Sequence, residues 1–470
     1  MIPPFRNVLL LNPPSGLYRR DDRCQSRVED QTVRIVFPPV DLALLAAVLR
    51  KEGAQVKIAD YPARNLSWEQ YHRDLLELKP DTVLFNVTTA TIRDDLQAAR
   101  LARRTIPGIR TIARGEYFEK EGETLFDQYP ELDLALHGEV EENLARLARG
   151  ESPSEMPAAL YRNQAGVRRN TGTARIEDLD SLPFPARDLL DNTLYRSPET
   201  GNPLTVILAN RGCPAKCVFC PAGEVSGFRL RLRSPESIVA ELRECVQRFN
   251  IHEFLFNGDT FTMRKPWLLD LCAAISEAGL SIRWGCNSRV DTMDAERAQA
   301  LKRAGCWVVA FGVESGDQEM LDRMKKGTRL EQSERAIAVC KQAGLATHTF
   351  FIIGLPWETR ASLQRTYALA RKLDPDFFDI NIAYPLPGTE LYQIAVAEGL
   401  LENPAGSYAQ ASMRTFSLSA AYLTRWRKRA LLKLYLRPGY IVRTIVRARR
   451  AGVLPHYLLA AAQRLKGLIR

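Results

Sequence analysis

Residues 210–223 read NRGCPAKCVFCPAG, and the three cysteines in this stretch, Cys213, Cys217 and Cys220, have the spacing C-x3-C-x2-C. Cysteine thiolates are the usual ligands of iron–sulfur clusters. Because a cubane cluster contains four irons, three thiolates leave one iron without a protein ligand, where a second molecule can bind. Gly212 and Pro214 favour a loop that wraps a cofactor over a regular strand. The stretch therefore predicts a 4Fe-4S site with these three cysteines as its metal ligands.

Other uses of the three cysteines are less compatible with the spacing. They can be buried apolar side chains, which is common for free cysteines in a globular core. A disulfide with one spare thiol is a second alternative. Zinc is a third, although structural zinc normally takes four protein ligands. The remaining six cysteines, at positions 24, 245, 272, 286, 306 and 340, form no second C-x-x-C set, and we expect them to serve packing.

Six strand-like runs, with helical segments between them, begin just before the cysteine loop and continue after it. They occupy residues 204–210, 253–259, 282–288, 307–313, 348–354 and 376–384. Six β-α units predict a partial barrel, a TIM-like wrap that does not close, with its chemistry at the carboxyl ends of the strands. The cysteine loop follows the first of these strands.

The first 150 residues also alternate strands and helices. NVLLLN at 7–12, QVKIAD at 55–60, TVLFNV at 82–87 and IRTIAR at 109–114 are separated by segments with helical apolar spacing. This alternation predicts a doubly wound α/β sheet, which binds ligands beyond the carboxyl ends of its strands. The residues expected there are Pro13, Pro14, Ser15, Thr88, Thr89, Gly115, Gly138 and Glu139.

The cysteine loop, followed by six β-α units, resembles the radical S-adenosylmethionine (SAM) superfamily. In that family SAM chelates the open iron, and reduction splits it into methionine and a 5′-deoxyadenosyl radical. The N-terminal part, with NPP at 12–14, KPDTVLFNVTT at 79–89 and HGEVEE at 137–142, resembles the cobalamin-binding domain of cobalamin-dependent radical SAM proteins. The resemblance implies three cofactors: a 4Fe-4S cluster, SAM and cobalamin.

The resemblance also implies site residues. It gives SAM-binding roles to strand-end residues of the barrel, namely Gly258, Asp259, Asn287, Ser288, Arg289, Glu314, Ser315, Gly354 and Pro356. SAM is cationic at its sulfur and ammonium groups, so the Asp259 and Glu314 carboxylates suit its pocket, although both can also be solvated charges at loop ends. The family's usual acidic pair after the second barrel strand is here Gly-Asp-Thr. The eight strand-end residues of the N-terminal domain become the expected cobalamin contacts.

Two features of the N-terminal domain depart from related cobalamin sites. The loop after the first strand, SGLYRRDDRC, lacks the histidine of the D-x-H-x-x-G cobalt-ligating motif of methionine synthase. The double glycine that is usual near position 114 is here Arg114-Gly115. We therefore expect cobalamin to bind without a protein imidazole on cobalt.

Length and composition predict several folded domains. At 470 residues, with 46% hydrophobic and 26% charged residues, the chain exceeds a single core. We expect a cobalamin-binding-like domain over 1–150, a linker over 151–200 with a hairpin-like piece near 159–169, a radical SAM domain over 201–400 and a basic tail over 401–470. There is no signal peptide and no apolar run of about 20 residues, so we expect a cytoplasmic protein.

The tail carries the whole positive excess of the chain. No acidic residue follows Glu402, while 14 of the 65 Lys and Arg residues do; the remaining 51 face 55 acidic residues, a net charge of −4. Interleaved with apolar residues and with Trp426, Tyr435 and Tyr440, these cations predict two or three basic amphipathic helices. Such helices suit an anionic membrane surface, here the inner face of the cell membrane. Packing on the barrel with a solvated basic face is the main alternative, and a nucleic-acid interface is the least favoured.

The favoured hypothesis is a radical SAM enzyme that uses cobalamin to methylate an unactivated carbon. The amphipathic tail suggests a hydrophobic substrate, such as a lipid or a hopanoid-like isoprenoid, and the chemistry requires a reductant such as flavodoxin or ferredoxin. One alternative is an oxidative cyclase of the Mg-protoporphyrin ester type, or another radical rearrangement. A non-enzymatic cobalamin sensor at a membrane surface, with a structural cluster, is another. No residue stands out as the group that exchanges protons or hydrogen with substrate.

Overall fold

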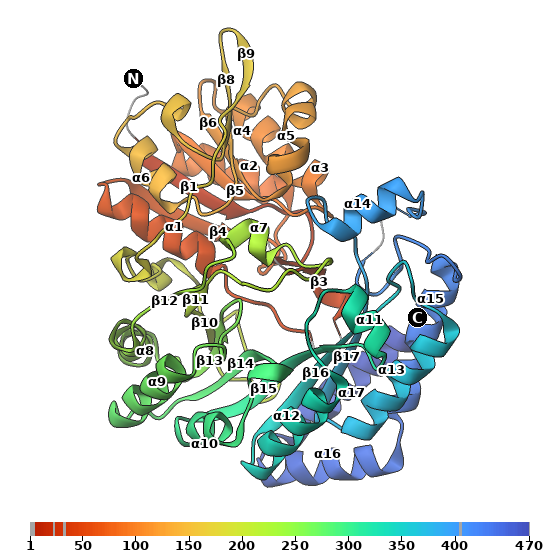
Figure 1. The fold of residues 1–470 in the computed structure, drawn as a ribbon. Helices are drawn as coiled ribbons and strands as arrows, with labels where there is room; N and C mark the ends of the chain where they lie inside the picture. Colours follow the sequence, from red (N-terminus) through yellow and green to blue (C-terminus); the bar gives the residue numbers. More distant parts are fainter. Residues whose placement is uncertain (1–4, 22–23, 32–33, 404–406, 470) are drawn as a thin grey trace. The chain divides into compact units, whose positions relative to one another are not determined.

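The computed structural model describes residues 5–21, 24–31, 34–403 and 407–469. The chain divides into two compact units. Figure 1 shows the chain coloured from the N-terminus in red to the C-terminus in blue. An N-terminal unit comprises Met1–Arg27, Val36–Leu194 and Glu224–Gly227. A barrel unit comprises Val28–Ile35, Tyr195–Gly223 and Phe228–Arg470.

The N-terminal unit is built on a seven-stranded sheet with the order β4-β1-β5-β6-β7-β8-β9. Its strands are β1 (Asn7–Asn12), β4 (Gln55–Asp60), β5 (Thr82–Asn86), β6 (Arg110–Arg114), β7 (Leu134–Leu136), β8 (Ala159–Asn163) and β9 (Gly166–Arg169). The first five in spatial order are parallel, and β8 and β9 add antiparallel to the edge. The hairpin expected near 159–169 is therefore part of this sheet.

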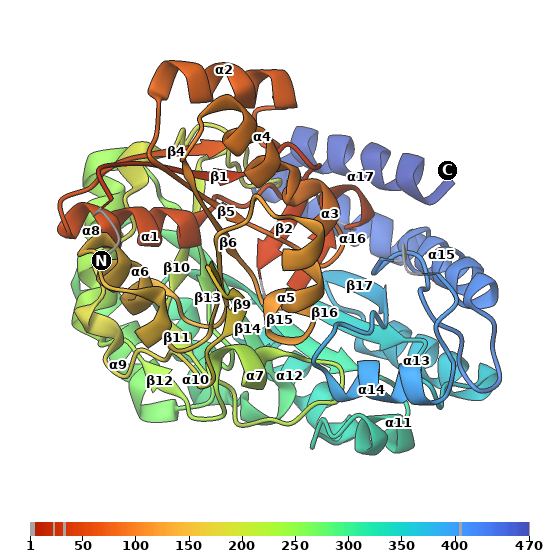
Figure 2. The ribbon, with the colours of Figure 1, turned by 90° about the horizontal axis from the view of Figure 1, so that it is seen from above.

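Helices cover both faces of this sheet. The core on one face includes α1 (Val40–Lys51) and α6 (Glu141–Ala148), and the core on the other includes α2 (Trp68–Leu78), α4 (Gln97–Thr105) and α5 (Tyr117–Gln128). Figure 2 shows α1 and α6 on one side of the strands and α2 and α4 on the other. The predicted doubly wound architecture is confirmed. The sequence analysis did not predict the small hairpin of β2 (Tyr18–Asp21) and β3 (Cys24–Arg27).

The barrel unit contains a curved sheet of six parallel strands in chain order. They are β10 (Leu204–Leu208), β13 (Glu253–Asn257), β14 (Arg283–Arg289), β15 (Cys306–Glu314), β16 (Ala346–Ile353) and β17 (Phe377–Ile382). The helices between them are α8 (Pro235–Phe249), α9 (Lys265–Glu277), α10 (Ala295–Arg303), α11 (Gln318–Arg323), α12 (Leu330–Gln342) and α13 (Arg360–Leu373), followed after β17 by α14 (Glu390–Ala397). The predicted partial six-stranded barrel is confirmed.

Alternation along each strand separates two faces of this sheet. On β16, Phe351 and Ile353 are fully buried in the core shared with the helices. His348, Phe350 and Ile352 are less buried and point to the opposite, concave face, as successive strand residues must. Five of the six other cysteines, at 245, 272, 286, 306 and 340, lie in the helix-facing core, so their assignment to packing is confirmed. The Cys24 side chain lies outside the described residues.

The tail forms three helices, α15 (Ala420–Tyr435), α16 (Pro438–Arg450) and α17 (Leu454–Ile469). Leu423, Leu431 and Leu434 of α15 belong to the barrel core. None of the helices that the structure describes is both long and apolar enough to cross a membrane.

Two tail aromatics do not lie where the amphipathic interpretation placed them. The Tyr435 ring stacks on Phe378 of β17 at a centroid distance of 4.2 Å, and its hydroxyl donates to the Phe378 carbonyl at 2.7 Å. Tyr440 is buried, and its hydroxyl donates to the Asp376 carbonyl at 2.9 Å. Both rings therefore pack on β17 and the segment before it, and do not lie at an outward-facing border of the tail helices as expected.

Candidate active site

The cysteine loop lies between β11 (Asn210–Arg211) and α7 (Ala222–Ser226). Cys213 is buried, and Cys217 and Cys220 are partly buried. Backbone hydrogen bonds at Val218 hold the loop at its centre: its N–H donates to the Met324 carbonyl at 3.0 Å, and its carbonyl accepts from the N–H of Leu391 at 2.8 Å. The loop is therefore fixed between the end of α11 and the start of α14.

Asp259, at the end of β13, holds the start of the same loop. Its Oδ2 accepts from the Gly212 N–H at 2.6 Å, and its own N–H donates to Oδ1 of Asn210 at 2.9 Å. A Cβ on Gly258 would lie 2.6 Å from that Asn210 oxygen, so only glycine permits this approach. Asn210 was not among the predicted site residues, although it directly precedes the cysteine loop. Asp259 therefore positions the loop, and this role does not depend on a contact between Asp259 and SAM.

Glu314 and Lys326 form a buried ion pair at the end of β15. Lys326 Nζ donates to Glu314 Oε1 at 2.6 Å, and the two side chains are 8% and 7% exposed. Glu314 has a left-handed backbone with φ of 66°, at an irregularity in the pairing of β15 with β16. Burial lowers the pKa of Lys326, but Glu314 and the Cys217 thiol outweigh it and leave that pKa raised. No sequence signal pointed to Lys326, because it follows α11 rather than a strand.

Arg289 supplies a second cation beside the cysteines. Its Nε and Nη2 donate to the two Asp291 oxygens, each at 2.9 Å, and Nη2 also donates to the Lys326 carbonyl at 2.8 Å. Burial raises the pKa of Cys217, whereas Lys326 and Arg289 act to lower it. Two fixed cations therefore favour the thiolate that a metal site needs.

Burial dominates the ionisation of the other two cysteines. It raises the pKa of Cys213, and it raises the pKa of Cys220 to about 12, with contributions of the same sign from the other two thiols. Among the described residues, no three His, Cys, Asp or Glu side chains are grouped as ligands of one metal ion. A cluster does not need such a grouping, since each thiolate binds a different iron.

The remaining predicted SAM residues differ in how far they are buried and in their hydrogen bonds. Asn287 is exposed at the end of β14, and Ser288 Oγ is 2.6 Å from Thr262 Oγ1. Ser315 is fully buried, with Oγ 3.2 Å from Thr366 Oγ1 and accepting from the Asp317 N–H, so it supports the start of α11.

The loop after β16 is ordered by an internal carboxylate. The N–H of Gly354, which has φ of 83°, donates to Glu358 Oε2 at 3.3 Å. The Pro356 carbonyl accepts from the Phe416 N–H at 2.8 Å. Burial raises the pKa of Glu358 to about 7. The sequence analysis missed Glu358, which holds the backbone of the predicted Gly-Leu-Pro segment.

In the N-terminal unit, the strand ends of β1 and β5 meet around a buried carboxylate. Asp95 forms an ion pair with Arg20 at 3.0 Å, their side chains being 0% and 4% exposed. Asp95 also accepts from the Ser15 hydroxyl and, at 3.0 Å, from the Thr88 N–H. The order β4-β1-β5 makes this the switch point of the sheet, where such folds bind ligands. Pro13 and Pro14 shape the turn from β1 into Ser15.

The other predicted cobalamin residues lie in the loops that follow β5, β6 and β7. The Thr89 N–H donates to Gln25 Oε1 at 2.7 Å. A Cβ on Gly115 would lie 2.6 Å from Val87 Cγ2, so glycine at this position lets the loop after β6 approach the loop after β5 closely. The Gly138 N–H donates to a Glu116 oxygen at 2.6 Å, while Glu139 is buried and accepts from the Ile176 N–H at 2.7 Å. Glu139 therefore anchors the segment near residue 176.

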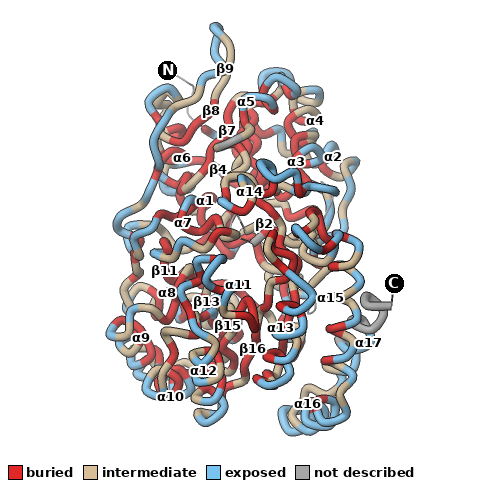
Figure 3. Tube along the Cα trace, turned by 45° about the vertical axis from the view of Figure 1, so that its right-hand side comes forward, coloured by how far each residue is buried: buried red, intermediate tan, exposed pale blue. Residues whose placement is uncertain are grey.

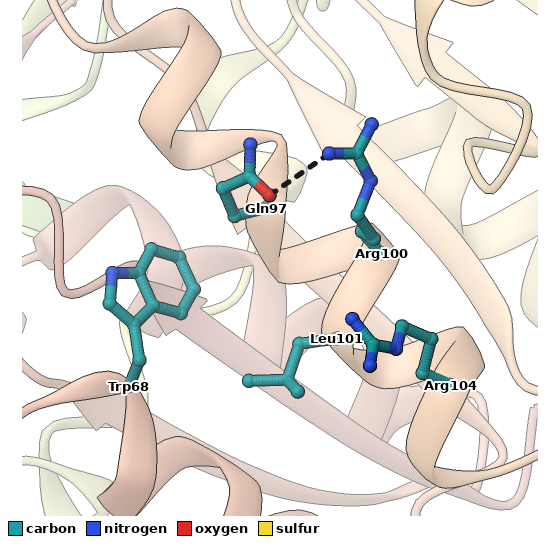
Figure 4. Close-up of a pocket in the computed structure, with 5 residues that line it drawn as sticks. All are labelled: Trp68, Gln97, Arg100, Leu101 and Arg104. Atoms are coloured by element: carbon teal, nitrogen blue, oxygen red, sulfur yellow. Dashed lines mark hydrogen bonds between the residues drawn. The ribbon is translucent and has the colours of Figure 1, made fainter.

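A separate surface pocket of the N-terminal unit lies between α2 and α4. Figure 4 shows Trp68 and Leu101 facing one hollow, with Arg104 at its border and Arg100 bonded to Gln97. None of the predicted cobalamin residues lines it, so it is not part of the strand-end site.

Comparisons with known proteins agree with both sites. Residues 207–370 match the family model for the radical SAM superfamily, and residues 30–148 match that for the B12 binding domain. The chain is 30% identical over 470 residues to an uncharacterized methyltransferase of Pyrococcus horikoshii, covering 98% of both chains. The chain belongs to the radical SAM superfamily, in the branch with a B12-binding domain.

Two further comparisons extend this assignment. The chain is 27% identical over 369 residues to the anaerobic magnesium-protoporphyrin IX monomethyl ester cyclase of Rubrivivax gelatinosus, covering 76% of this chain and 66% of the relative. Its fold is similar to that of the radical SAM methyltransferase TsrM from Kitasatospora setae, solved with cobalamin and a 4Fe-4S cluster. That match has a TM-score of 0.68 and 21% identity, and covers 90% of this chain and 81% of TsrM.

This radical SAM protein is an enzyme that uses a 4Fe-4S cluster, SAM and cobalamin. Its residues fit these groups. Cys213, Cys217 and Cys220 lie close enough to influence one another's ionisation, and Lys326 and Arg289 balance their negative charge. Thr88, Thr89, Gly115, Gly138 and Glu139 lie within the part of the chain that matches the B12 binding domain. Radical SAM enzymes generally need a reductant such as flavodoxin or ferredoxin, and this enzyme shares that requirement.

Proposed function

We propose that this enzyme methylates an unactivated carbon of a hydrophobic, lipid-like or isoprenoid substrate and works at an anionic membrane surface. When bound, the cluster and SAM supply a radical that removes a hydrogen atom from the substrate, and cobalamin supplies the methyl group. In this proposal the predicted SAM and cobalamin residues keep the roles that the sequence analysis gave them. The observation that supports a hydrophobic substrate is the exposed apolar surface of α16.

The chain's own residues prepare the SAM end of the site. Asp259 and Asn210 fix the start of the cysteine loop, and Glu358 fixes the loop after β16. Lys326 offers a buried ammonium next to Cys217, where it can hold a carboxylate of SAM after exchange with Glu314. These contacts preorganise the site before SAM binds, so little reorganisation remains during the reaction.

The exposed face of α16 supports delivery from a membrane. Among the described residues, twelve large apolar side chains are exposed, and seven of them lie between Leu436 and Leu459. On α16, Ile441, Val442, Ile445 and Val446 are 39–62% exposed. They follow each other at helical spacing, and Arg449 extends the same stripe; we call these five residues the α16 outer face. In Figure 3 most residues of α16 carry the colour of exposed residues.

The opposite face of α16 packs on the barrel. Tyr440 and Ala448 are buried there, and Arg447 pairs with Asp376. One face of α16 therefore packs on the barrel, and in this proposal the other face meets the membrane. An apolar stripe beside exposed Arg449 and Arg450 is the pattern that anionic bilayers bind.

The test compares membrane lipids and apolar metabolites of a deletion strain with those of its parent. We expect a compound in the parent that is about 14 mass units heavier than its counterpart in the deletion strain, the mass of one added methylene. A strain carrying Cys217→Ala serves as the control for loss of radical chemistry. A mass change typical of ring formation would favour the cyclase reaction named for the Rubrivivax relative. A change confined to polar metabolites would contradict the hydrophobic substrate.

A further inference from the structure

His348 and Asp379 form a polar pair on the concave face of the barrel sheet, away from the helices. His348 Nε2 lies 2.9 Å from Asp379 Oδ2, and the two side chains keep 18% and 12% of their surface accessible. Their strand neighbours Thr349, Phe378 and Ile380 point to the helix side. With the proton on Nε2, the pair offers two further acceptors, His348 Nδ1 and Asp379 Oδ1.

Asp379 Oδ1 is buried and has no hydrogen-bond partner among the described residues. A buried carboxylate oxygen without a donor is destabilising, because it has lost its hydrogen bonds to water and gained none from the protein. Arg427 lies near enough to stabilise the charge of Asp379, but its Nε donates to the Ile380 carbonyl at 2.6 Å. The fold therefore leaves one oxygen of this pair without a donor from the described residues.

The surroundings of the pair are aromatic. The His348 ring lies 4.4 Å from Phe350 and 5.9 Å from Phe377, centroid to centroid, and Phe377 meets Trp307 edge-on at 6.1 Å. The Arg283 guanidinium lies over the Trp307 ring, 3.6 Å from its centroid. Arg447 covers Phe377 and Arg283 covers Trp307. A ligand here would therefore place an apolar body against Phe350 and one polar group on the pair.

The strand register relates this pair to the SAM end of the site. Arg289 pairs with Gly312, Gly312 with Phe350, and Phe350 with Asp379, so one row crosses four strands on the concave face. With strands about 4.8 Å apart, the row is about 14 Å long measured along the curved sheet, so its two ends are closer than that through space. A substrate of modest length can therefore reach from Asp379 toward the reacting end near Arg289.

We propose that His348 and Asp379 are the polar anchor of the substrate site and bind a hydroxyl or protonated amine on an otherwise apolar, ring-containing substrate. The inference rests on the proposed function, because it places the substrate on the concave face of the barrel. It narrows the substrate class to hydrophobic molecules that carry a hydrogen-bond donor within about 14 Å of the reacting end.

The test uses full-length protein labelled with 15N-histidine and loaded with the oxidised cluster and hydroxocobalamin. The sequence has five histidines, at positions 72, 137, 252, 348 and 456, so a His348→Gln variant assigns the relevant NMR resonance. The probes are 4-tert-butylcyclohexanol and its methyl ether, which share an apolar ring and differ in the donor. We expect the alcohol to shift the His348 resonance saturably and the ether to bind at least tenfold more weakly.

Two variants locate the effect. Asp379→Asn replaces a charged acceptor by a neutral one, and we expect about fivefold weaker binding of the alcohol. Thr349→Val is the matched control, since Thr349 also has a buried hydroxyl without a partner but faces the helices. It should leave binding unchanged. Equal binding of both probes, no shift of the His348 resonance, or equal effects of the two variants would overturn the proposal. Because no SAM cleavage is measured, this outcome is independent of the methyl-transfer test.

Discussion

The ammonium of Lys326 lies 2.6 Å from the Glu314 carboxylate, and both groups are buried beside Cys217. Removing one partner leaves the other as an uncompensated buried charge, which typically costs about 3–5 kcal/mol. We therefore expect Lys326→Met to lower the free energy of unfolding of the barrel unit by that amount. Adding Glu314→Gln should recover much of the loss, because the buried charge is then gone.

The control for this prediction is the neighbouring residue. Lys325 pairs with Glu390 at 2.6 Å, but the two side chains are 53% and 42% exposed. Lys325→Met should change stability by less than about 1 kcal/mol. Urea unfolding followed by tryptophan fluorescence measures the difference, since five of the six tryptophans lie in the barrel unit. Equal losses in the two single variants would show that the buried pair carries no special energy.

Iron content tests the three cluster ligands. Replacing Cys213, Cys217 or Cys220 with Ala should abolish both the brown cluster and SAM cleavage, because each thiolate binds its own iron. Cys340→Ala is the matched control, since Cys340 is fully buried in the helix-facing core. It should keep its iron and its SAM cleavage. Normal iron in the Cys217→Ala protein would remove the cluster assignment.

The raised pKa of Glu358 predicts that the difference in stability between the parent and a Glu358→Gln variant depends on pH. Its pKa is about 7 in the folded protein, above the ordinary value near 4.5, so the folded state holds its proton more tightly than the unfolded state does. The stability from this group is complete below about pH 4.5 and is lost as the pH rises through 7. Relative to the parent, Glu358→Gln should therefore gain about 2.5 kcal/mol between pH 5 and pH 8. Thermal unfolding of both iron-free proteins at the two pH values measures the gain, and a difference that does not change with pH would contradict the burial argument.

Much of the architecture could be predicted from local patterns. Continuous apolar runs such as NVLLLN and TVLFNV mark strands that are buried on both faces, and these strands form within one or two residues of the expected bounds. The cysteine spacing located the cluster loop for the same reason, because all three ligands lie on one short segment. Tyr435 and Tyr440 were misplaced because periodicity shows that a helix has two faces, but not which face meets the protein.

The support of the site could not be predicted in the same way. Asn210, Lys326, Glu358 and Asp95 act through contacts with residues that lie 4 to 80 positions away in the chain. Only the fold decides which strand ends meet, and no single-sequence pattern reports it. The unpartnered oxygen of Asp379 belongs to the same class, since its burial depends on the curvature of the sheet.

Because no histidine lies in the loop after β1, we expect no protein imidazole to bind cobalt. We expect the cob(II)alamin form of the protein to show no nitrogen hyperfine splitting from an imidazole donor in its paramagnetic resonance spectrum. His137 is the residue to examine, because it is buried at the end of β7 next to Gly138. The spectrum of His137→Gln should match that of the parent. Imidazole splitting that disappears in this variant would identify His137 as a ligand and refute the expectation.

The last prediction concerns the α16 outer face. Burying a Val or Ile side chain is worth about 1.5–3 kcal/mol, so a bilayer contact at this face should depend strongly on Val442 and Ile445. We expect Val442→Asn with Ile445→Asn to lower partitioning onto anionic vesicles at least tenfold. Leu76→Asn with Val396→Asn is the control, because both apolar side chains are 52% exposed outside the tail.

Point variants are needed here because the tail cannot simply be removed. Leu423, Leu431 and Leu434 of α15 complete the barrel core, so a chain ending near Glu402 would lose stability as well as any membrane contact. Arg449→Gln with Arg450→Gln should weaken binding to anionic vesicles by roughly 1 kcal/mol per cation at low salt and leave the weak binding to neutral vesicles unchanged. Co-sedimentation at low and high salt measures both effects. If the Val442 and Ile445 variant binds anionic vesicles as the parent does, the α16 outer face does not meet the bilayer and the main support for a lipid-like substrate is lost.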